Sequence, residues 1–350
     1  MIVCPARLEP TFSPRPWGSL SLAPFFPEKA NLAEPLGEAW LTGSDCRFTD
    51  GPFAGKTLGE AWPVLPPEWT GTQVERGRAF PILVKFIFPE EKLSVQVHPD
   101  DDYASRHEQK AGGRGKTEMW YALRARPGAE VLVGLKPSVT REQFQRAIAD
   151  GTAENCLEHI PLRPGDAVFV PAGTAHTIGP GLVLCEIQQH SDLTYRVYDY
   201  NRRDAQGRAR ELHIEKALDV MRFGKQMGGK VEPVRILRGP LTETHYAACR
   251  YFAAEQWEFS ESIGAATSRE HFDLLIFLEG SGSIHWSAER AEYAPAQVWL
   301  IPAALGDYRL APDARTSLLR AYVPGDLDQL GRRLAERGVA EAEWSRLVHR

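Results

Sequence analysis

The chain has 350 residues, of which 43% are hydrophobic and 25% are charged, and its formal net charge is −5. This length supports two or three domains with a sizeable core, and the slightly acidic balance argues against general nucleic-acid binding. The five cysteines are scattered without a Cys-x-x-Cys pair, which disfavours a disulfide framework and a thiolate metal site. We expect a cytoplasmic protein without a membrane partner, because the chain shows neither a leader pattern nor a window approaching ~18 apolar residues.

Short apolar segments separated by Gly, Pro and Asp dominate the chain and predict β-strands. Two helices are expected among them, at residues 140–150, with Thr140 as N-cap, and at residues 211–222. Many short strands with few helices favour a jelly-roll or barrel architecture. The predicted strands in the first two thirds of the chain are residues 82–88, 130–135, 167–170, 182–188 and 194–199.

Residues 93–98, LSVQVH, carry polar side chains at every second position. Because side chains alternate along a strand, Ser94, Gln96 and His98 are expected to share one face, opposite an apolar face. Residues 116–118 repeat this spacing with Lys116 and Glu118. The two segments therefore place oxygen and nitrogen donors in rows on predicted strands.

Residues 165–176, GDAVFVPAGTAH, read as a strand followed by a stiff Pro-Ala-Gly turn that presents His176. This pattern resembles the second half of a cupin metal site, in which the histidine points into a small β-barrel. A lone histidine is more often a core residue, but residues 93–98 supply a matching first half. We therefore predict one metal site formed by Gln96, His98, Glu118 and His176.

Neutral imidazoles, a carboxylate and an amide suit one Zn²⁺ per chain, with a position open for water or substrate. Since no thiolate belongs to the set, Mn²⁺, Fe²⁺ and Co²⁺ remain alternatives. Glutamine alone is a rare ligand and a common surface residue, so the prediction depends on the four residues together.

A second barrel-like copy begins near residue 234, with strand-like segments at residues 272–283 and 296–302. Aligning Pro302 with Pro171 puts Asp307 where His176 stands, and the upstream histidine pattern is missing. We expect this copy to lack a metal and to pack against the first.

After Pro324 the apolar residues of segment 327–348 recur at roughly helical spacing among charges, which predicts an amphipathic tail helix or, alternatively, an oligomer contact.

The predicted fold class is therefore mainly β, with two cupin (jelly-roll) barrels, small helical inserts and a C-terminal helical tail. The predicted domains are a metal-binding barrel over residues 1–233, a degenerate barrel over 234–324 and the tail over 325–350.

Several segments resemble type I mannose-6-phosphate isomerases in their short bacterial form, in order and at similar spacing over roughly residues 11–323. This family implies a zinc-dependent cupin enzyme that interconverts mannose 6-phosphate and fructose 6-phosphate. The matching segments are residues 16–18 (PWG), 37–40 (GEAW), 93–101 (LSVQVHPDD), 115–121 (GKTEMWY), 165–176, 186–200 (EIQQHSDLTYRVYDY) and 210–220 (RELHIEKALDV).

The resemblance also implies site residues. Arg196 matches the arginine of the family's catalytic segment, Glu186 matches a carboxylate proposed as acid/base, and Lys116 matches an active-site lysine. For Arg196 the local alternative is an ion pair with Asp192 or Asp199, and for Glu186 it is a buried structural carboxylate.

Ser94 and Lys216 resemble the family's phosphate contacts, which makes them the predicted substrate-binding residues. The alternative for Lys216 is an exposed helix lysine, the commoner situation for that residue type. Arg210, in a polar loop with three other arginines, is a further candidate for holding phosphate.

Two other functions compete with a phosphosugar isomerase. A non-catalytic sugar- or metal-binding cupin would not need Arg196 and Lys116 beside the ligand set, and a cupin dioxygenase is disfavoured by Gln96 in place of the usual histidine. An isomerase for a related phosphosugar also remains open. We expect a small-molecule partner and a monomer or small homo-oligomer.

Overall fold

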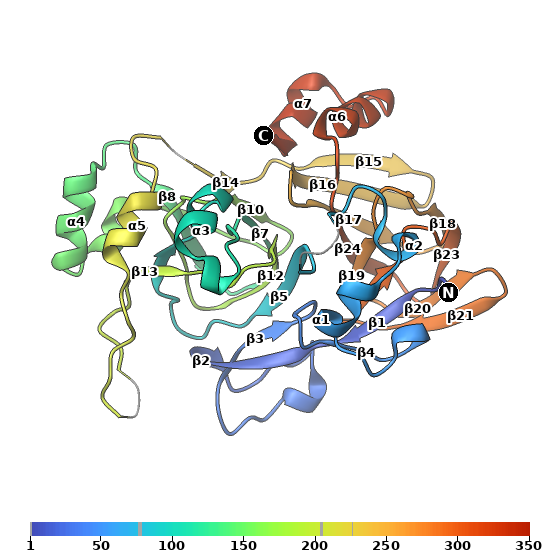
Figure 1. Cartoon of the computed structure of the whole chain (residues 1–350), viewed down its shortest axis with the longest axis horizontal. Coiled ribbons are helices and arrows are strands. Elements are labelled where there is room, and N and C mark those ends of the chain that lie inside the picture. Colours follow the sequence, from blue (N-terminus) through green and yellow to red (C-terminus); the bar gives the residue numbers. More distant parts are fainter. Residues whose placement is uncertain (1, 76–78, 204–205, 226) are drawn as a thin grey trace. The chain divides into compact units, whose positions relative to one another are not determined.

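The computed structural model describes residues 2–75, 79–203, 206–225 and 227–350, and these form two compact units (Figure 1). The first, here the first barrel, comprises Phe12–Ala39 and Lys85–Lys230. The second barrel comprises Met1–Thr11, Trp40–Val84 and Val231–Arg350. Each contains two β-sheets, and the mainly β class predicted from the short apolar segments is confirmed.

In the first barrel a seven-stranded and a five-stranded sheet enclose the core. Residues of both sheets meet there, such as Trp120 and Leu184 from one and Val133 and Ile178 from the other. In spatial order the larger sheet is β14 (Gly229–Lys230), β10 (Ala167–Val170), β7 (Glu118–Ala125), β12 (Leu182–Gln189), β5 (Ile82–Ile87), β3 (Leu36–Trp40) and β2 (Thr11–Ser19). The smaller sheet is β13 (Tyr195–Tyr198), β6 (Val95–Val97), β11 (His176–Ile178), β8 (Glu130–Leu135) and β9 (Leu157–Pro161).

The second barrel repeats this plan with a nine-stranded and a four-stranded sheet. Its core joins Trp257, Phe277 and Leu318 from the larger sheet to Ile284 and Leu310 from the smaller. The larger sheet runs β15 (Val234–Arg238), β16 (Leu241–Cys249), β17 (Ala253–Phe259), β24 (Thr316–Tyr322), β19 (Asp273–Glu279), β22 (Val298–Ile301), β1 (Ala6–Glu9) and β4 (Arg47–Phe48), with β25 (Val348–His349) paired to β16. The smaller runs β18 (Ile263–Ala266), β23 (Asp307–Pro312), β20 (Gly282–Trp286) and β21 (Glu289–Tyr293).

Short helices decorate both barrels. Thr140 caps α4 in a reciprocal capping box with Gln143, as the sequence predicts. The helix predicted at 211–222 begins only at Ile214, because His213 takes a non-helical conformation and its backbone N–H bonds Arg196 O. The α-helices are α1 (Leu58–Ala61), α2 (Pro67–Thr70), α3 (Asp101–His107), α4 (Arg141–Ala149), α5 (Ile214–Val220), α6 (Leu327–Glu336) and α7 (Glu341–Leu347), and the 3₁₀ turns are Pro27–Lys29, Gly51–Phe53, Trp62–Val64, Gln109–Ala111 and Ala153–Cys156.

The C-terminal tail is helical as predicted, but it is two helices. Gly338 adopts a left-handed φ of +86° between α6 and α7, a conformation that favours glycine and ends the first helix. Leu330 packs against Tyr322, and Leu334 packs near Val234. Both contacts lie within the second barrel, which is the docking expected for an amphipathic tail.

Each compact unit is formed by segments that are separated in the sequence. The domains predicted from the sequence are instead continuous segments. Residues 6–8 of β1 pair with β22, which draws the N-terminus into the second barrel. The division into a metal-binding and a degenerate domain concerns function and stays a prediction. At the turn after β22, Pro302 leads to Asp307 at the start of β23, just as Pro171 leads to His176 at the start of β11.

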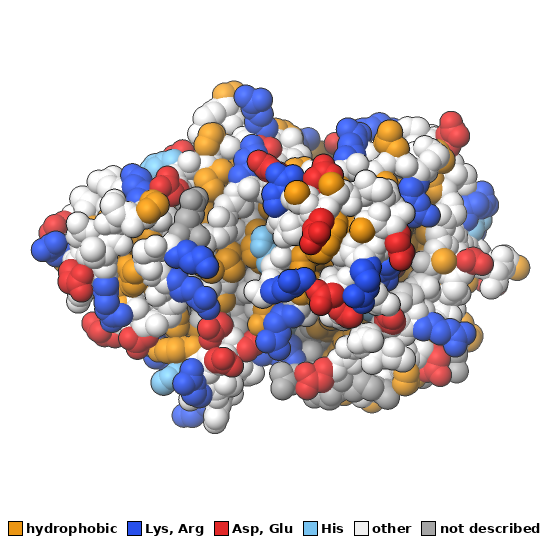
Figure 2. All heavy atoms as spheres, turned by 90° about the horizontal axis from the view of Figure 1, so that it is seen from above, with side chains coloured by type: hydrophobic (Ala, Val, Ile, Leu, Met, Phe, Trp, Pro, Cys, Tyr) orange, Lys and Arg blue, Asp and Glu red, His pale blue; other side chains and the backbone are white. Residues whose placement is uncertain are grey.

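The surface carries both signs of charge. Figure 2 shows Lys and Arg side chains interspersed with Asp and Glu side chains over the visible face. Within the described part of the chain, none of the helices combines the length and the apolar character that crossing a bilayer requires.

Candidate active site

Gln96 occupies the centre of a three-strand arrangement in the first barrel. It lies opposite His176 on β11 and opposite Arg196 on β13. Residues directly opposite each other on antiparallel strands present their side chains to the same face of the sheet. The register of β6 therefore brings together three predicted site residues that are distant in the sequence.

A stiff turn delivers His176. Strand β10 ends at Val170, and Gly173 in the Pro-Ala-Gly turn has a φ of +85°. A Cβ at Gly173 would come within 2.8 Å of the Val220 carbonyl oxygen, so only glycine fits there without movement. The Gly173 N–H also donates to the backbone carbonyl of His98 over 2.8 Å. This hydrogen bond connects the turn before His176 to His98, the other histidine of the predicted metal site.

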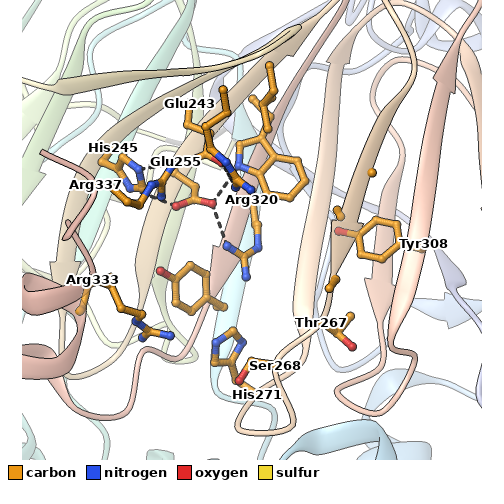
Figure 3. Close-up of a pocket in the computed structure, with 18 of the residues that line it drawn as sticks. Glu243, His245, Glu255, Thr267, Ser268, His271, Tyr308, Arg320, Arg333 and Arg337 are labelled. Atoms are coloured by element: carbon orange, nitrogen blue, oxygen red, sulfur yellow. Dashed lines mark hydrogen bonds and ion pairs between the residues drawn. The ribbon is translucent and has the colours of Figure 1, made fainter. Parts of the chain in front are cut away.

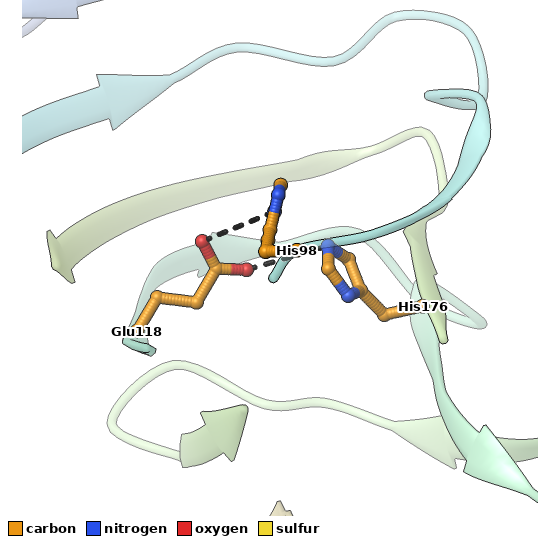
Figure 4. Close-up of side chains that lie close together, drawn as sticks. All are labelled: His98, Glu118 and His176. Atoms are coloured by element: carbon orange, nitrogen blue, oxygen red, sulfur yellow. Dashed lines mark ion pairs between the residues drawn. The ribbon is translucent and has the colours of Figure 1, made fainter. Parts of the chain in front are cut away.

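Glu118, at the start of β7, faces both histidines with the two oxygens of its carboxylate (Figure 4). Its Oε1 is 3.4 Å from His176 Nε2, and its Oε2 is 3.7 Å from His98 Nε2. One ligand atom from each of the three lies within 4.8 Å of the others, and all three side chains are buried. The predicted trio thus converges in the folded chain.

Both imidazoles are held by their other nitrogen. His98 Nδ1 lies 2.7 Å from the Leu193 carbonyl oxygen, and His176 Nδ1 lies 2.9 Å from that of Thr174. A carbonyl only accepts, so Nδ1 carries the proton and Nε2 presents a lone pair toward Glu118. Burial lowers the pKa of His98 well below its ordinary value and lowers the pKa of His176 to about 4, so both rings are neutral at physiological pH.

These residues fit a divalent metal ion. Metals bind neutral imidazole and ionised carboxylate, and a ligating histidine typically donates its second N–H to a carbonyl. Within the described protein, Oε1 of the buried Glu118 carboxylate accepts no hydrogen bond. The ammonium of Lys116, 2.8 Å from Oε2, is the cation these oxygens face in the protein itself.

Gln96 adjoins the trio in a different way. Its Nε2 lies 3.2 Å from His176 Nε2 and donates to it, whereas its Oε1 accepts from Ser94 Oγ over 3.4 Å. To offer the amide oxygen to an ion beside His176, the amide must turn over, and the hydrogen bond to the ring is then lost. Gln96 can therefore serve as the predicted fourth ligand only after its side-chain amide rotates.

Glu186 and Lys116 form a buried charged pair beside the trio. Lys116 Nζ is 3.7 Å from Glu186 Oε1, which also accepts a 3.1 Å hydrogen bond from Trp120 Nε1. Burial raises the pKa of Glu186 to about 7, despite the opposing ammonium groups of Lys116 and Lys85. Burial alone would lower the pKa of Lys116, but the carboxylates of Glu118 and Glu186 outweigh it and raise that pKa.

Arg196 is half-buried and makes neither of its local ion pairs. Its Nε donates to Ser94 Oγ over 3.2 Å and its Nη1 donates to the Glu211 carbonyl over 3.0 Å. Asp192 pairs with Lys85 instead, and Asp199 pairs with Arg202 and Arg210. The guanidinium is thus oriented by neutral oxygens while its positive charge stays available.

A cavity of about 440 Å³ in the first barrel unites most of the predicted residues. It is lined by Ser94, Gln96, Lys116, Glu186, Arg196 and Arg210. Lys216 is not among its lining residues. That side chain is about half exposed, and its Nζ lies 2.7 Å from Glu108 Oε1.

Four charged residues of the same cavity were not predicted as site residues. Lys85 is 1% exposed and bridges Asp192, at 3.2 Å, and Glu186, at 3.7 Å. Arg15 and Glu38 also line the cavity and pair over 2.8 Å. One signal was readable for Lys85, because it is the single charge within the apolar run ILVKFI. Nothing local distinguishes Arg15 and Glu38 from surface residues.

Known proteins similar to this chain are mannose-6-phosphate isomerases, as the sequence motifs predict. The model of the type I phosphomannose isomerase catalytic domain matches residues 6–154. "Probable mannose-6-phosphate isomerase GmuF" of Bacillus subtilis is 37% identical over 313 residues, covering 87% of this chain and 96% of that protein. "Mannose-6-phosphate isomerase ManA" of the same organism is 33% identical, covering 87% and 95%.

Solved structures agree on the fold. The crystal structure of the mannose 6-phosphate isomerase from Bacillus subtilis superposes with a TM-score of 0.82 at 30% identity, covering 91% of this chain and 99% of that one. A phosphomannose isomerase from Salmonella typhimurium shares the fold, with a TM-score of 0.72 at 17% identity. The predicted pair of cupin barrels is thereby confirmed. The chain belongs to the type I mannose-6-phosphate isomerase family.

Proposed function

We propose that this chain interconverts mannose 6-phosphate and fructose 6-phosphate, with one divalent ion, Zn²⁺, held by Gln96, His98, Glu118 and His176. The observation that carries the proposal is the convergence, in one cavity of about 440 Å³, of Gln96 from this set with Lys116, Glu186 and Arg196. Family membership supports the reaction and its phosphosugar substrate. Cytoplasmic location and a monomeric or small homo-oligomeric state stay predictions.

The reaction moves a carbonyl between C1 and C2, so a proton must leave one carbon and return to its neighbour. When bound, the ion polarises the sugar oxygens as a Lewis acid. The chain's own residues must then transfer the proton, orient the sugar and stabilise negative charge on oxygen. Each of these tasks has a candidate in the cavity.

Glu186 is proposed to accept and return the proton. A carboxyl group whose pKa lies near 7 has both protonation states available at physiological pH, which is what proton transfer in two directions needs. The 3.1 Å hydrogen bond from Trp120 fixes its orientation. Lys116, whose Nζ lies 3.7 Å from Glu186 Oε1, supplies a positive charge beside it and is proposed to donate an N–H to a sugar oxygen.

Arg196 is proposed to act at the reacting end. The guanidinium keeps its proton and offers a planar fork of N–H donors to an oxyanion. Its hydrogen bonds to Ser94 Oγ and Glu211 O hold it in place before substrate arrives. Such preorganised donors act without further rearrangement when charge develops on the substrate.

Ser94 and Lys216 are proposed to bind the phosphate, with Arg210 in support. Ser94 and Arg210 line the cavity, which supports their part of the assignment. For Lys216 the proposal requires the ammonium to leave Glu108 and turn toward the substrate. The assignment of Lys216 therefore depends on the substrate test given in the Discussion.

A coupled assay tests the function. Purified protein should convert mannose 6-phosphate to fructose 6-phosphate, lose activity on chelation and regain it when Zn²⁺ is restored. A non-catalytic binding cupin would bind the sugar phosphate without forming product. Absence of turnover in metal-supplemented protein that binds mannose 6-phosphate would overturn the proposal.

A further inference from the structure

The second barrel contains a cavity of about 590 Å³ to which the isomerase reaction assigns no role (Figure 3). Its walls come from strands β15, β16, β17, β18, β23 and β24 and from helix α6 of the C-terminal tail. Trp257, Tyr308 and Tyr322 contribute aromatic surface, while Thr267 and Ser268 contribute hydroxyl groups. Four arginines, Arg238, Arg320, Arg333 and Arg337, line it against the carboxylates of Glu243, Glu255 and Asp307.

A buried network of alternating charges forms one wall. Arg320 donates to Glu255 Oε1 over 2.8 Å and to Asp273 Oδ1 over 2.9 Å. Glu255 in turn lies 3.0 Å from His245 Nδ1, and Glu243 pairs with Arg238 and Arg337. Ion pairs in a protein interior cost desolvation energy and are weak evidence of a purely stabilising role. Side chains whose only role was to fill the barrel interior would be apolar, unlike the charged residues of this network.

Several hydrogen-bond donors that line the cavity have no hydrogen-bond partner within the described protein. They are Arg320 Nε, the Tyr308 hydroxyl and two nitrogens of Arg333, Nε and Nη2. Tyr308 is only 4% exposed, and an unmade hydrogen bond at such depth is costly. All of these groups can donate, so the ligand they fit is rich in acceptor oxygens.

Arg333 is the most informative of these donors. Among the described residues it has neither an ion pair nor a hydrogen bond, whereas the guanidinium groups of Arg320 and Arg337 are matched by carboxylates. Its neighbour on α6, Arg332, is 66% exposed and lies 3.6 Å from Asp326. Helix α6 therefore directs one arginine into the cavity and the other to solvent.

His245 adds a further positive charge to the wall. Burial would lower its pKa, but Glu255 and Glu243 outweigh that effect and raise the pKa to about 9. The imidazole is therefore protonated at neutral pH, so its charge adds to those of the arginines. Burial raises the pKa of Tyr308, which keeps its hydroxyl protonated as a donor.

We propose that this cavity is a second ligand site, which binds the phosphate monoester of a small polyol. The phosphate oxygens would accept from Arg333, since arginine is well suited to bidentate phosphate recognition, and Arg320 Nε and the Tyr308 hydroxyl would donate to the polyol oxygens. The aromatic wall of Trp257 and Tyr322 would contact the carbon skeleton, and the hydroxyls of Thr267 and Ser268 would contact the polyol.

Calorimetric titration tests the proposal, with mannitol 6-phosphate as the probe because it has no carbonyl and cannot be isomerised. The wild-type chain should bind two equivalents, one in each barrel. Arg333→Gln should bind one, and the matched control Arg332→Gln should bind two. One equivalent in the wild type, or two in Arg333→Gln, would overturn the proposal.

Two further titrations separate the parts of the ligand. Mannitol should bind at least tenfold more weakly than its phosphate at this site, whereas equal binding of the two would contradict the anion-binding role. Inorganic phosphate binding as tightly as mannitol 6-phosphate would reduce the cavity to a simple ion site and would also contradict the proposal.

A second variant covers the case in which Arg333→Gln fails to fold. Tyr308→Phe removes only the hydroxyl and should weaken the binding of mannitol 6-phosphate to the second barrel about threefold to tenfold. Unchanged affinity in Tyr308→Phe would then count against the site.

Discussion

Arg196 Nε donates a 3.2 Å hydrogen bond to Ser94 Oγ, across a separation of 102 residues in the sequence. The same guanidinium reaches the Glu211 carbonyl with Nη1. Two hydrogen bonds from different atoms of one planar group fix its orientation, which a flexible ammonium group cannot reproduce. This geometry bears directly on the role of Arg196.

Arg196→Lys keeps the positive charge but loses the planar fork. We predict that kcat falls on the order of a hundredfold while KM changes little, as expected for an interaction made mainly in the transition state. Steady-state kinetics with mannose 6-phosphate checks this. If only KM rises, Arg196 belongs to phosphate binding instead.

Glu186 should determine how kcat/KM depends on pH on the acidic side of the optimum. As a base it must be ionised, and its pKa is raised to about 7, so kcat/KM should rise with pH through about 7. Glu186→Gln should lower kcat about 10²-fold to 10⁴-fold. The measurement is kcat/KM between about pH 5 and pH 9, a range that brackets the raised pKa of Glu186.

Trp120→Phe provides a finer test of the same residue. The indole N–H stabilises the ionised carboxylate of Glu186 over 3.1 Å, so its removal should raise the pKa further. The acidic limb of kcat/KM should then move to higher pH. A limb at an unchanged pH in Trp120→Phe would assign the titration to another group.

Lys216→Ala decides whether this lysine binds phosphate. A charge-assisted hydrogen bond contributes about 1.5–3 kcal/mol, so the variant should lose one to two powers of ten in kcat/KM for mannose 6-phosphate. For free mannose, which lacks the phosphate, the loss should be negligible. No loss on either substrate would restrict Lys216 to its ion pair with Glu108, and equal losses on both would indicate a structural or chemical role.

His245 makes the second barrel sensitive to alkaline pH. Its pKa is raised to about 9 from an unfolded value near 6.5, so its stabilising contribution is complete below about pH 6.5 and is lost as pH rises through about 9. The thermal midpoint of the wild type should therefore fall more steeply over this range than that of His245→Gln. Parallel curves for the two proteins would contradict the prediction.

Much of the fold was predictable because strand segments and turns leave local signals. The strand 167–170 and the N-cap at Thr140 appear where the sequence places them. Alternation predicted a shared apolar face for Leu93, Val95 and Val97, but Leu93 packs in a different cluster because β6 begins only at Val95. This two-residue difference in where the strand starts is decided by tertiary pairing rather than by the local pattern.

The site was predictable where chemistry and spacing coincide, and less so where partners come from distant segments. His98, Glu118 and His176 stand out as donors and do converge. The position of Lys216 beside Glu108 could not be foreseen, because residues 108 and 216 meet only through tertiary packing. The network around Arg320 was also missed, although a lone arginine in the apolar strand TSLLRAY was a readable signal.

The central claim is that Gln96, His98, Glu118 and His176 hold one divalent ion on which the activity depends. The most direct test is elemental analysis of metal-supplemented protein, combined with the coupled assay on the same samples. The wild type and Asp307→Ala should each contain one equivalent and be active, whereas His176→Ala should contain almost none and be inactive. Two equivalents in the wild type, or a full equivalent retained in His176→Ala, would contradict the account.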